Sequence, residues 1–344
     1  MVIIGLTISV FFMIRHNHSL EKKEHSKLLL EEIKLKYNSI LDSYANTADI
    51  LYNHYVNNPY ILNIYKKADS DNKKIREDVR QKLLKIMEPV YDKMKTHHVR
   101  QFHFHLPNST SFLRLHKPGK YGDSLKDIRY SVKLANSQQR KVRGLESGRV
   151  NYGFRNVFPL IHEGEHLGSV EISFGFDYIR DKLHKTFPRD YSFLIKKSVV
   201  EKTMWENQQR QYVPSKLCEN YLKEKSSKTD SSLTHLDKKG VDQILKKVKN
   251  GGNCVLPIRR KNSVIAHIFL TISNVEGEQI AYLHSAAADP TFESYHDQYI
   301  IEIVLLISTA IIILIITFFL IRHSWHRVKS EEKFTGIPLP RMKN

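Results

Sequence analysis

The segment Val99–His116, VRQFHFHLPNSTSFLRLH, carries the pattern that decides the fold. In its first half, apolar and polar residues alternate, which is the period of a β-strand. Pro107, Asn108 and Ser109 are turn-forming residues, and the alternation resumes from Ser111 to His116. The segment therefore predicts an antiparallel hairpin with one apolar face and one polar, aromatic face.

Two helices are predicted before the hairpin. From Leu20 to Val56, apolar residues recur three and four positions apart, and no Pro or Gly occurs until Pro59. A second helix with the same period runs from about Lys73 to Lys95. The first helix is long for a globular domain, which indicates a juxtamembrane stalk or a dimer seam, or else a helix that packs on the domain's own sheet.

After the hairpin, the chain predicts one complete module and one reduced module. The expected elements are helix Ser124–Gln139, strands Val142–Glu146, Phe154–Leu160 and Leu167–Phe176, a helical bridge Asp177–Lys185, strands Tyr191–Ile195, Cys254–Ile258, Val264–Ile272 and Gln279–Ser285, and helix Val241–Val248. Helices beside antiparallel strands in two successive groups indicate an α+β fold with two tandem modules.

Two apolar runs flank this region. Ile300 to Ile321, IIEIVLLISTAIIILIITFFLI, is long enough to cross a membrane. Val2 to Ile14 is shorter, but no basic segment precedes it and no cleavage pattern follows, so we expect an uncleaved anchor. Basic residues from Arg322 to Lys329 favour a cytoplasmic tail at 322–344. We therefore expect transmembrane helices at 1–15 and 299–321, with residues 16–299 outside the cytoplasm; in a bacterium, these helices would lie in the inner membrane and residues 16–299 in the periplasm.

The formal charge of +18 and the pI near 9.6 raise the possibility of nucleic-acid binding. The expected topology places most of this charge outside the cytoplasm, and no zinc-finger or ribonucleoprotein motif occurs. Catalytic signatures such as GxSxG, HExxH and the Walker loop are also missing from the sequence. We expect a protein that is not an enzyme and does not bind nucleic acid, with no cofactor.

Histidine and cysteine leave two smaller questions. His103 and His105 are two residues apart on a strand, so both project to one side, but a zinc site needs three or four ligands and no third is evident. We therefore expect half-exposed strand histidines and no metal site.

The two cysteines leave a separate question. Cys218 and Cys254 permit one disulfide in an oxidising compartment, but their spacing alone does not decide whether it forms.

A resemblance is carried by FHFHLPNSTSFLRLHKPGKYGDSL and by GLESGRVNYGFRNVFPLI with GEHLGSVEISF. These strings resemble the double-Cache (dCache) sensor domains of bacterial transmembrane receptors, the double sensory domain found ahead of histidine kinases and diguanylate cyclases, over residues 20–295. The resemblance implies tandem PAS-like modules: a membrane-distal one at 96–188 that binds a small molecule and a membrane-proximal one at 189–298 that relays the change, after helices at 16–95. It also implies a homodimer through the N-terminal helix.

Polar residues in and beside the first module's strands form the candidate ligand site. Arg114 is the leading candidate because its planar fork suits a carboxylate or phosphate. The expected ligand-binding residues are Arg114, His116, Tyr121, Asp123, Arg129, Glu146, Arg155 and Glu171, with Arg149 as a further possibility. The alternatives are a structural salt-bridge network and the solvated face of an antiparallel sheet.

These observations predict a membrane-anchored sensory module that binds a small polar or anionic ligand, such as an amino acid, organic acid or amine. The signal would pass through the second span, either to an output domain (cyclase, kinase or chemotaxis type) that this sequence does not contain or to a cytoplasmic signalling partner. The chain would then be a truncated receptor or a stand-alone sensor. The alternative is an envelope interaction or structural protein with a basic ectodomain and no ligand.

Overall fold

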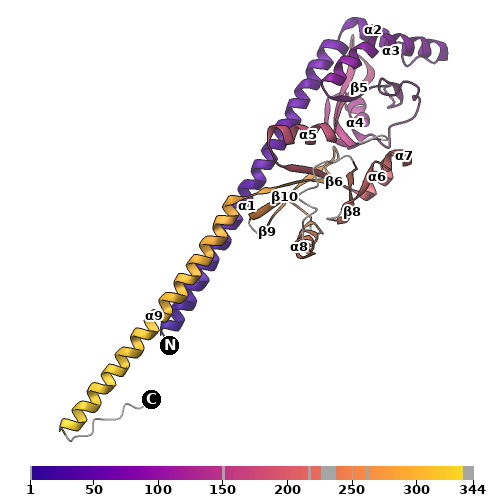
Figure 1. Ribbon diagram of the computed structural model, residues 1–344. Helices are drawn as coiled ribbons and strands as arrows, with labels where there is room; N and C mark the ends of the chain where they lie inside the picture. The colour runs from indigo at the N-terminus through magenta and orange to yellow at the C-terminus, as the bar shows by residue number, and fades with distance from the viewer. Residues whose placement is uncertain are drawn as a thin grey trace. The chain divides into compact units, whose positions relative to one another are not determined.

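A computed structural model describes residues 2–148, 152–215, 218–225, 238–249, 251–260 and 263–335. The chain divides into two compact units: Ser26–Ala288 forms one, and Met1–His25 with Asp289–Asn344 forms the other. Each unit is described by itself below, with the elements labelled as in Figure 1.

The helices before the first sheet are α1 (Val2–Leu51), α2 (Pro59–Tyr65) and α3 (Lys73–Thr96). The stretch from Leu20 to Val56 is helical throughout, as predicted, with its last five residues in a π-helix, η1 (Tyr52–Val56), and the helix begins earlier, at Val2. Asn58 caps α2 by accepting a hydrogen bond from the Ile61 amide at 3.1 Å, with Pro59 in the first turn.

The first module contains a five-stranded antiparallel sheet in the order β2-β1-β5-β4-β3. Its elements are β1 (Val99–His105), β2 (Ser111–Arg114), α4 (Tyr130–Gln138), β3 (Val142–Ser147), β4 (Tyr152–His162) and β5 (Glu165–Gly175). Both strands of the hairpin are almost entirely buried, on the polar face as well as on the apolar one. The solvated-face interpretation is therefore wrong for this sheet, because loops and helices cover both sides of it.

The second module contains a six-stranded sheet in the order β7-β8-β6-β11-β10-β9. Its elements are α5 (Phe176–Thr186), β6 (Asp190–Lys196), α6 (Lys197–Thr203), α7 (Glu206–Gln209), β7 (Tyr212–Ser215), β8 (Cys218–Glu224), α8 (Lys238–Lys249), β9 (Cys254–Arg260), β10 (Ser263–Ser273) and β11 (Gln279–Ala288). Ile244 and Val248 of α8 pack on Leu194, Phe269 and Tyr282 of the sheet, which forms the core of this module.

The two modules touch at β3 and the β10–β11 turn. The Val275 amide donates to the Leu145 carbonyl at 3.1 Å, and the Val275 side chain packs on the Val132–Val142–Val157 cluster. Gly144 has φ of +156°, and a Cβ there would lie 2.8 Å from the Val275 side chain. Glycine at this position therefore permits the close approach of the turn.

Strand order excludes the disulfide that the sequence left open. Cys218 begins β8 and Cys254 begins β9, with β6, β11 and β10 between them. Four strand steps at ~4.8 Å each separate the two strands by roughly 19 Å, whereas bridged Cα atoms lie within about 7 Å. Consistent with this separation, Cys254 is a half-buried free thiol.

The second unit pairs the beginning of α1 with α9 (Pro290–Thr335). His25 and Asp289 lie 2.9 Å apart, and the His18 and Tyr299 rings are 4.9 Å apart. Within the described ranges, one helical segment, Pro290–Arg327, is long and apolar enough to cross a membrane. The expected first span lies inside α1 and stays a prediction.

Candidate functional site

Strand register brings the predicted charged residues onto one face of the first sheet. His103 of β1 lies opposite Arg114 of β2 on one side and opposite Glu171 of β5 on the other. Arg155 of β4 lies opposite Ser173 of β5, one side-chain repeat along from Glu171. Residues from five different elements, including Arg129 at the start of α4, therefore meet over this sheet.

Arg129, Glu146, Glu171 and Arg155 form a connected network of ion pairs. Arg129 donates from Nε to Glu146 at 2.8 Å and from Nη2 to Glu171 at 2.6 Å. Arg155 donates from Nη1 to the other Glu171 oxygen at 2.8 Å. Glu146 also accepts from the Ser131 amide in the first turn of α4, where a carboxylate is favoured. Two guanidinium groups thus balance two carboxylates, which allows all four to be buried.

The pKa values follow from this pairing. Burial alone would raise the pKa of Glu171, but the attraction of Arg129 and Arg155 outweighs burial, and the pKa lies below its ordinary range. Burial lowers the pKa of Arg155 to about 10, against the opposing effect of Glu171. Both groups are therefore charged at neutral pH, and the network is ionic.

Arg114 is not part of this network. Its partner comes from the covering loop (residues 117–129), which lies between β2 and α4. Its two Nη atoms donate to the two Asp123 carboxylate oxygens at 2.7 and 2.9 Å, and Nη1 also donates to the Lys120 carbonyl at 2.8 Å. The Arg114 side chain is 6% exposed, whereas the Asp123 side chain is 39% exposed. A buried guanidinium is thus paired with a carboxylate that water can reach.

The covering loop is fixed to the sheet edge by backbone hydrogen bonds. The Gly122 amide donates to the Ser111 carbonyl at 2.8 Å, and the Ser111 amide donates to the Asp123 carbonyl at 3.0 Å. Beneath this loop, a cavity of about 20 Å³ remains. It is lined by Gln101, His103, Arg114, His116, Leu125, Arg129 and Trp205. This volume holds about one water molecule, so side chains fill the predicted pocket.

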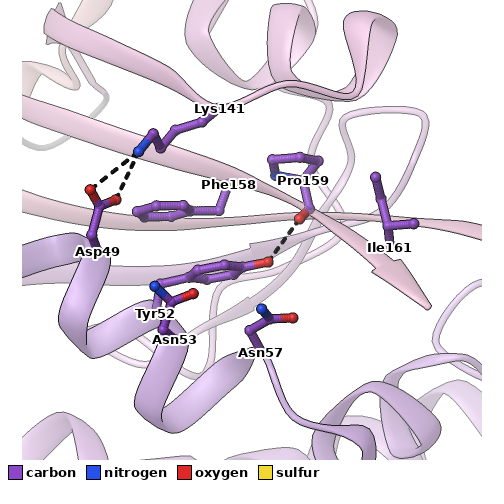
Figure 2. Close-up of a pocket in the computed structure, with 8 residues that line it drawn as sticks. All are labelled: Asp49, Tyr52, Asn53, Asn57, Lys141, Phe158, Pro159 and Ile161. Atoms are coloured by element: carbon purple, nitrogen blue, oxygen red, sulfur yellow. Dashed lines mark hydrogen bonds and ion pairs between the residues drawn. The ribbon is translucent and has the colours of Figure 1, made fainter.

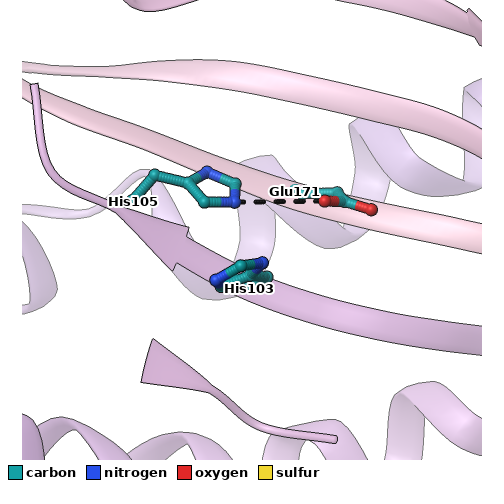
Figure 3. A group of neighbouring side chains, drawn as sticks. All are labelled: His103, His105 and Glu171. Atoms are coloured by element: carbon teal, nitrogen blue, oxygen red, sulfur yellow. Dashed lines mark ion pairs between the residues drawn. The ribbon is translucent and has the colours of Figure 1, made fainter. Parts of the chain in front are cut away.

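Two histidines contribute to the same face, as Figure 3 shows. His103 and His105 were expected to be half-exposed, but both are buried, with 2% and 0% exposure. Burial lowers the pKa of His105 to about 3 and holds that of His103 well below its usual range. Both rings are therefore neutral at physiological pH. His105 Nε2 has no hydrogen-bond partner and lies 3.9 Å from Glu171.

Glu171 supplies the third metal ligand that the sequence did not reveal, since β5 pairs with β1. His103, His105 and Glu171 have donor atoms within 4.8 Å of one another. However, each Glu171 oxygen already accepts from an arginine, and the surrounding charges are balanced. A divalent cation would add uncompensated charge in a buried site that holds three guanidinium groups. The donor set is present, but its surroundings do not fit a resident cation.

The structure gathers seven of the eight predicted residues. Arg114, His116, Asp123, Arg129, Glu146, Arg155 and Glu171 belong to the network, to the cavity beside it or to the Arg114–Asp123 pair. Tyr121 does not line the cavity, because its ring lies against the Arg80 guanidinium at 3.7 Å. Arg149 lies outside the described residues.

Sequence reasoning missed other members of the site. Gln101 and Ser173 contact Arg155, and strand alternation shared with His103 and Glu171 could have placed both on this face. Ser131 contacts Glu146 from α4. Trp205 has no comparable signal, because it comes from the second module, more than sixty residues beyond α4 in the chain.

Larger hollows in the described part of the chain lie away from the Arg114–Asp123 pair, and two of them are lined by residues of the first module. Figure 2 shows one of about 430 Å³ beside η1, where Tyr52 stacks on Phe158 and Lys141 pairs with Asp49 at 3.0 Å. A groove of about 570 Å³ is lined by Glu146 and Ser147, by residues of α6 and by the β10–β11 turn. Glu146 therefore belongs both to the buried network and to this groove.

Comparison with known proteins places this chain in a family. The dCache_3 model, described as "Double sensory domain of two-component sensor kinase", matches residues 38–283. A search of curated proteins found no match.

The solved structures to which this chain is similar include two bacterial sensor domains. The ligand-binding domain of the Campylobacter jejuni chemoreceptor Tlp3 in complex with L-valine has 10% identity and a TM-score of 0.43, covering 80% of this chain and 97% of that one. The sensor domain of the V. cholerae histidine kinase DctB has 9% identity and a TM-score of 0.39, covering 76% and 98%. The resemblance noted from the sequence is confirmed by the family model. The chain therefore belongs to the family of double sensory domains of two-component sensor kinases.

Proposed function

We propose that this chain is a membrane-anchored sensory module whose distal module, residues 96–188, binds a small polar or anionic ligand. Membership of a sensory-domain family supports the sensory role. The buried guanidinium groups over the first sheet support an anionic ligand, because arginine matches carboxylate and phosphate geometry. The signal passes through α9, the helix that is long and apolar enough to span a membrane.

The observation that carries this proposal is the Arg114–Asp123 pair. Arg114 binds the Asp123 carboxylate with both of its Nη atoms, and a ligand carboxylate would adopt the same bidentate geometry. Asp123 belongs to a loop and is partly exposed, so exchanging it for a ligand leaves no charge buried without a partner. The Arg129–Glu146–Glu171–Arg155 network forms the fixed floor of the site. A ligand ammonium would have to compete with these arginines for Glu146 or Glu171.

Thermal-shift screening of the full chain in lipid nanodiscs tests the site. The panel contains amino acids, organic acids and amines. For a carboxylate hit, Arg114→Ala should weaken binding by about 10- to 100-fold, the usual contribution of hydrogen bonds to a charged group. Arg114→Lys should recover only part of this loss, since lysine cannot bind bidentately.

Arg140→Ala is the matched control, because Arg140 is exposed on the same module and, among the described residues, bonds to Gln138 alone. It should bind like the wild type. A hit whose affinity is unchanged by Arg114→Ala would place the ligand elsewhere.

The second candidate function is an envelope interaction protein that binds no ligand. The filled cavity, with room for about one water, favours it. Crosslinking in cells distinguishes the ligand-binding sensor from the interaction protein. A homodimer through α1, whose Leu28, Leu35 and Ile50 are exposed, should give a product of twice the chain mass with Leu35→Cys. A crosslink to another envelope protein, without any ligand hit, would favour the interaction protein.

A further inference from the structure

Trp205 belongs to the second module but lines the cavity of the first. It lies between α6 and α7, and its ring closes the same space as His103, Arg114 and His116. Both modules are parts of one compact unit, Ser26–Ala288. The side chain that completes the candidate ligand site is therefore supplied by the module that is expected to relay the signal.

The covering loop holds the indole ring by two cation–π contacts. Lys117 Nζ lies 5.0 Å from the ring centroid and Lys120 Nζ lies 4.7 Å from it. Lys120 is also the residue whose carbonyl accepts from Arg114. Such contacts between partly exposed groups are individually weak. The indole thus rests on the loop that carries Asp123 without being locked to it.

The backbone on either side of Trp205 is held more firmly. The Trp205 carbonyl accepts from the Gln208 amide at 2.8 Å, the Met204 amide donates to Val200 at 3.0 Å, and Met204 is buried. α6 follows directly from β6, which lies in the interior of the second sheet. A movement of the Trp205 ring would therefore be passed to the corner between α6 and α7, and through α6 to β6.

We propose that Trp205 is the cap of the distal ligand site and the contact through which ligand binding reaches the second module. The proposal rests on the proposed function. The ring closes the site while Asp123 occupies Arg114. A ligand that takes the place of Asp123 moves the loop, and the indole then packs on the ligand or moves away. Either movement changes the position of the α6–α7 corner.

Chemical modification tests the cap without any ligand. Diethyl pyrocarbonate acylates accessible neutral imidazoles, and His103 and His116 line the cavity under the indole. In the full chain in nanodiscs, Trp205→Ala should raise the modification rate of these two histidines by about tenfold or more, as expected for groups protected by local closure. Peptide mass spectrometry gives the rate at each histidine. Unchanged rates would overturn the proposal.

Two controls keep this test independent of misfolding. Trp325→Ala removes the other tryptophan, which lies on α9, and should leave His103 and His116 protected. His267 and His284 are buried in the second sheet and should stay unmodified in every variant. If they also become reactive in Trp205→Ala, the less disruptive Trp205→Leu replaces it, and the same comparison decides.

Fluorescence separates the cap from the proposed function. Trp325→Phe leaves Trp205 as the only tryptophan, so its emission reports the cap. A ligand that binds at Arg114 should shift this emission, and Trp205→Ala should change its affinity. Binding with neither effect would overturn the cap and leave the ligand site standing. Exposure of the histidines in Trp205→Ala with no binder in the panel would support the cap and count against the proposed function.

Discussion

Glu171 accepts hydrogen bonds from two buried guanidinium groups and is itself fully buried. Replacing Glu171 by Gln would leave Arg129 and Arg155 with only Glu146 as a counter-charge in a region without bulk water. Breaking a buried pair in this way costs about 3–5 kcal/mol of unfolding free energy. We therefore expect Glu171→Gln to lower stability by this amount in urea unfolding followed by circular dichroism.

Glu165→Gln is the control for Glu171→Gln. Glu165 lies on the same strand, β5, and pairs with Lys66 in an exposed position. The identical chemical change should have little effect there, because water screens the pair. Equal losses of stability at the two positions would contradict the claim that burial, and not the charge alone, determines the importance of Glu171.

Arg114 and Glu171 illustrate two uses of charge on one sheet face. Glu171 has partners that are as buried as itself, so its ion pairs are part of the fold. Arg114 has a partly exposed partner from a loop, so its pair can be exchanged for another carboxylate. This difference is why the proposed ligand contact is Arg114 and why its truncation is expected to affect binding more than folding.

At the scale of elements, a histidine pair links three strands of the second sheet. His267 of β10 and His284 of β11 share a hydrogen bond of 3.1 Å between Nδ1 and Nε2, and Ser192 of β6 contacts His284 at 3.2 Å. Burial lowers the pKa of His267 to about 4, with the Arg260 charge adding to the effect, and holds that of His284 well below its usual range. The folded pair therefore resists protonation.

This pair predicts that acid weakens the module. Below pH ~6.5 the unfolded chain binds protons at both histidines, whereas the folded pair stays neutral down to about pH 4. Stability is therefore complete above pH ~6.5 and falls as the pH drops towards 4. The double variant His267→Gln/His284→Gln should flatten this slope by about 1.4 kcal/mol per pH unit for each histidine removed.

Urea unfolding at several pH values between about 7 and 4.5 measures the slope. His296→Gln is the control, because His296 is exposed on α9. It should keep the wild-type slope. A double variant with the wild-type slope would mean that other groups cause the acid sensitivity.

The elements show which parts of the fold the sequence could predict. Val99–His105 was predicted with the bounds of β1, because the alternation from Gln101 to His105 sets the strand period. The helix predicted from Ser124 begins only at Tyr130, since the Leu125 amide donates to Ser109 and Ser124 bridges Thr110. Tertiary contacts hold those six residues as part of the covering loop. The elements α2, α6, α7, β7 and β8 were not predicted, because their residues show neither a clear alternation of apolar and polar residues nor a helical spacing.

The site was predictable in its members but not in its pairing. Charged residues in apolar strands pointed to Arg114, Arg155 and Glu171. Which carboxylate each arginine meets depends on the strand order β2-β1-β5-β4-β3 and its register, which involve long-range contacts. The filled cavity and Trp205 depend on how the modules pack, and no local pattern encodes that.

At the scale of the whole molecule, the residues in and beside the apolar part of α9 predict which compartment each of its ends faces. Ile303 to Ile321 carries no charge, and at ~1.5 Å per residue it covers roughly 29 Å, close to the ~30 Å hydrocarbon core of a bilayer. Arg322, Arg327 and Lys329 follow at once, and basic residues beside a span stay in the cytoplasm. The sensory unit would then lie in the periplasm.

Cysteine labelling tests this orientation, in a background with Cys218→Ser and Cys254→Ser. Lys82→Cys lies on the exposed side of α3, and Ser330→Cys is exposed on α9 beyond the apolar run. A maleimide that cannot cross the inner membrane should label Lys82→Cys in cells with a permeabilised outer membrane, and Ser330→Cys only after lysis. The opposite pattern would reverse the orientation and place the Arg114 site in the cytoplasm. Because the proposed ligand must reach Arg114 from outside the cell, that result would also remove the basis for an extracytoplasmic sensor.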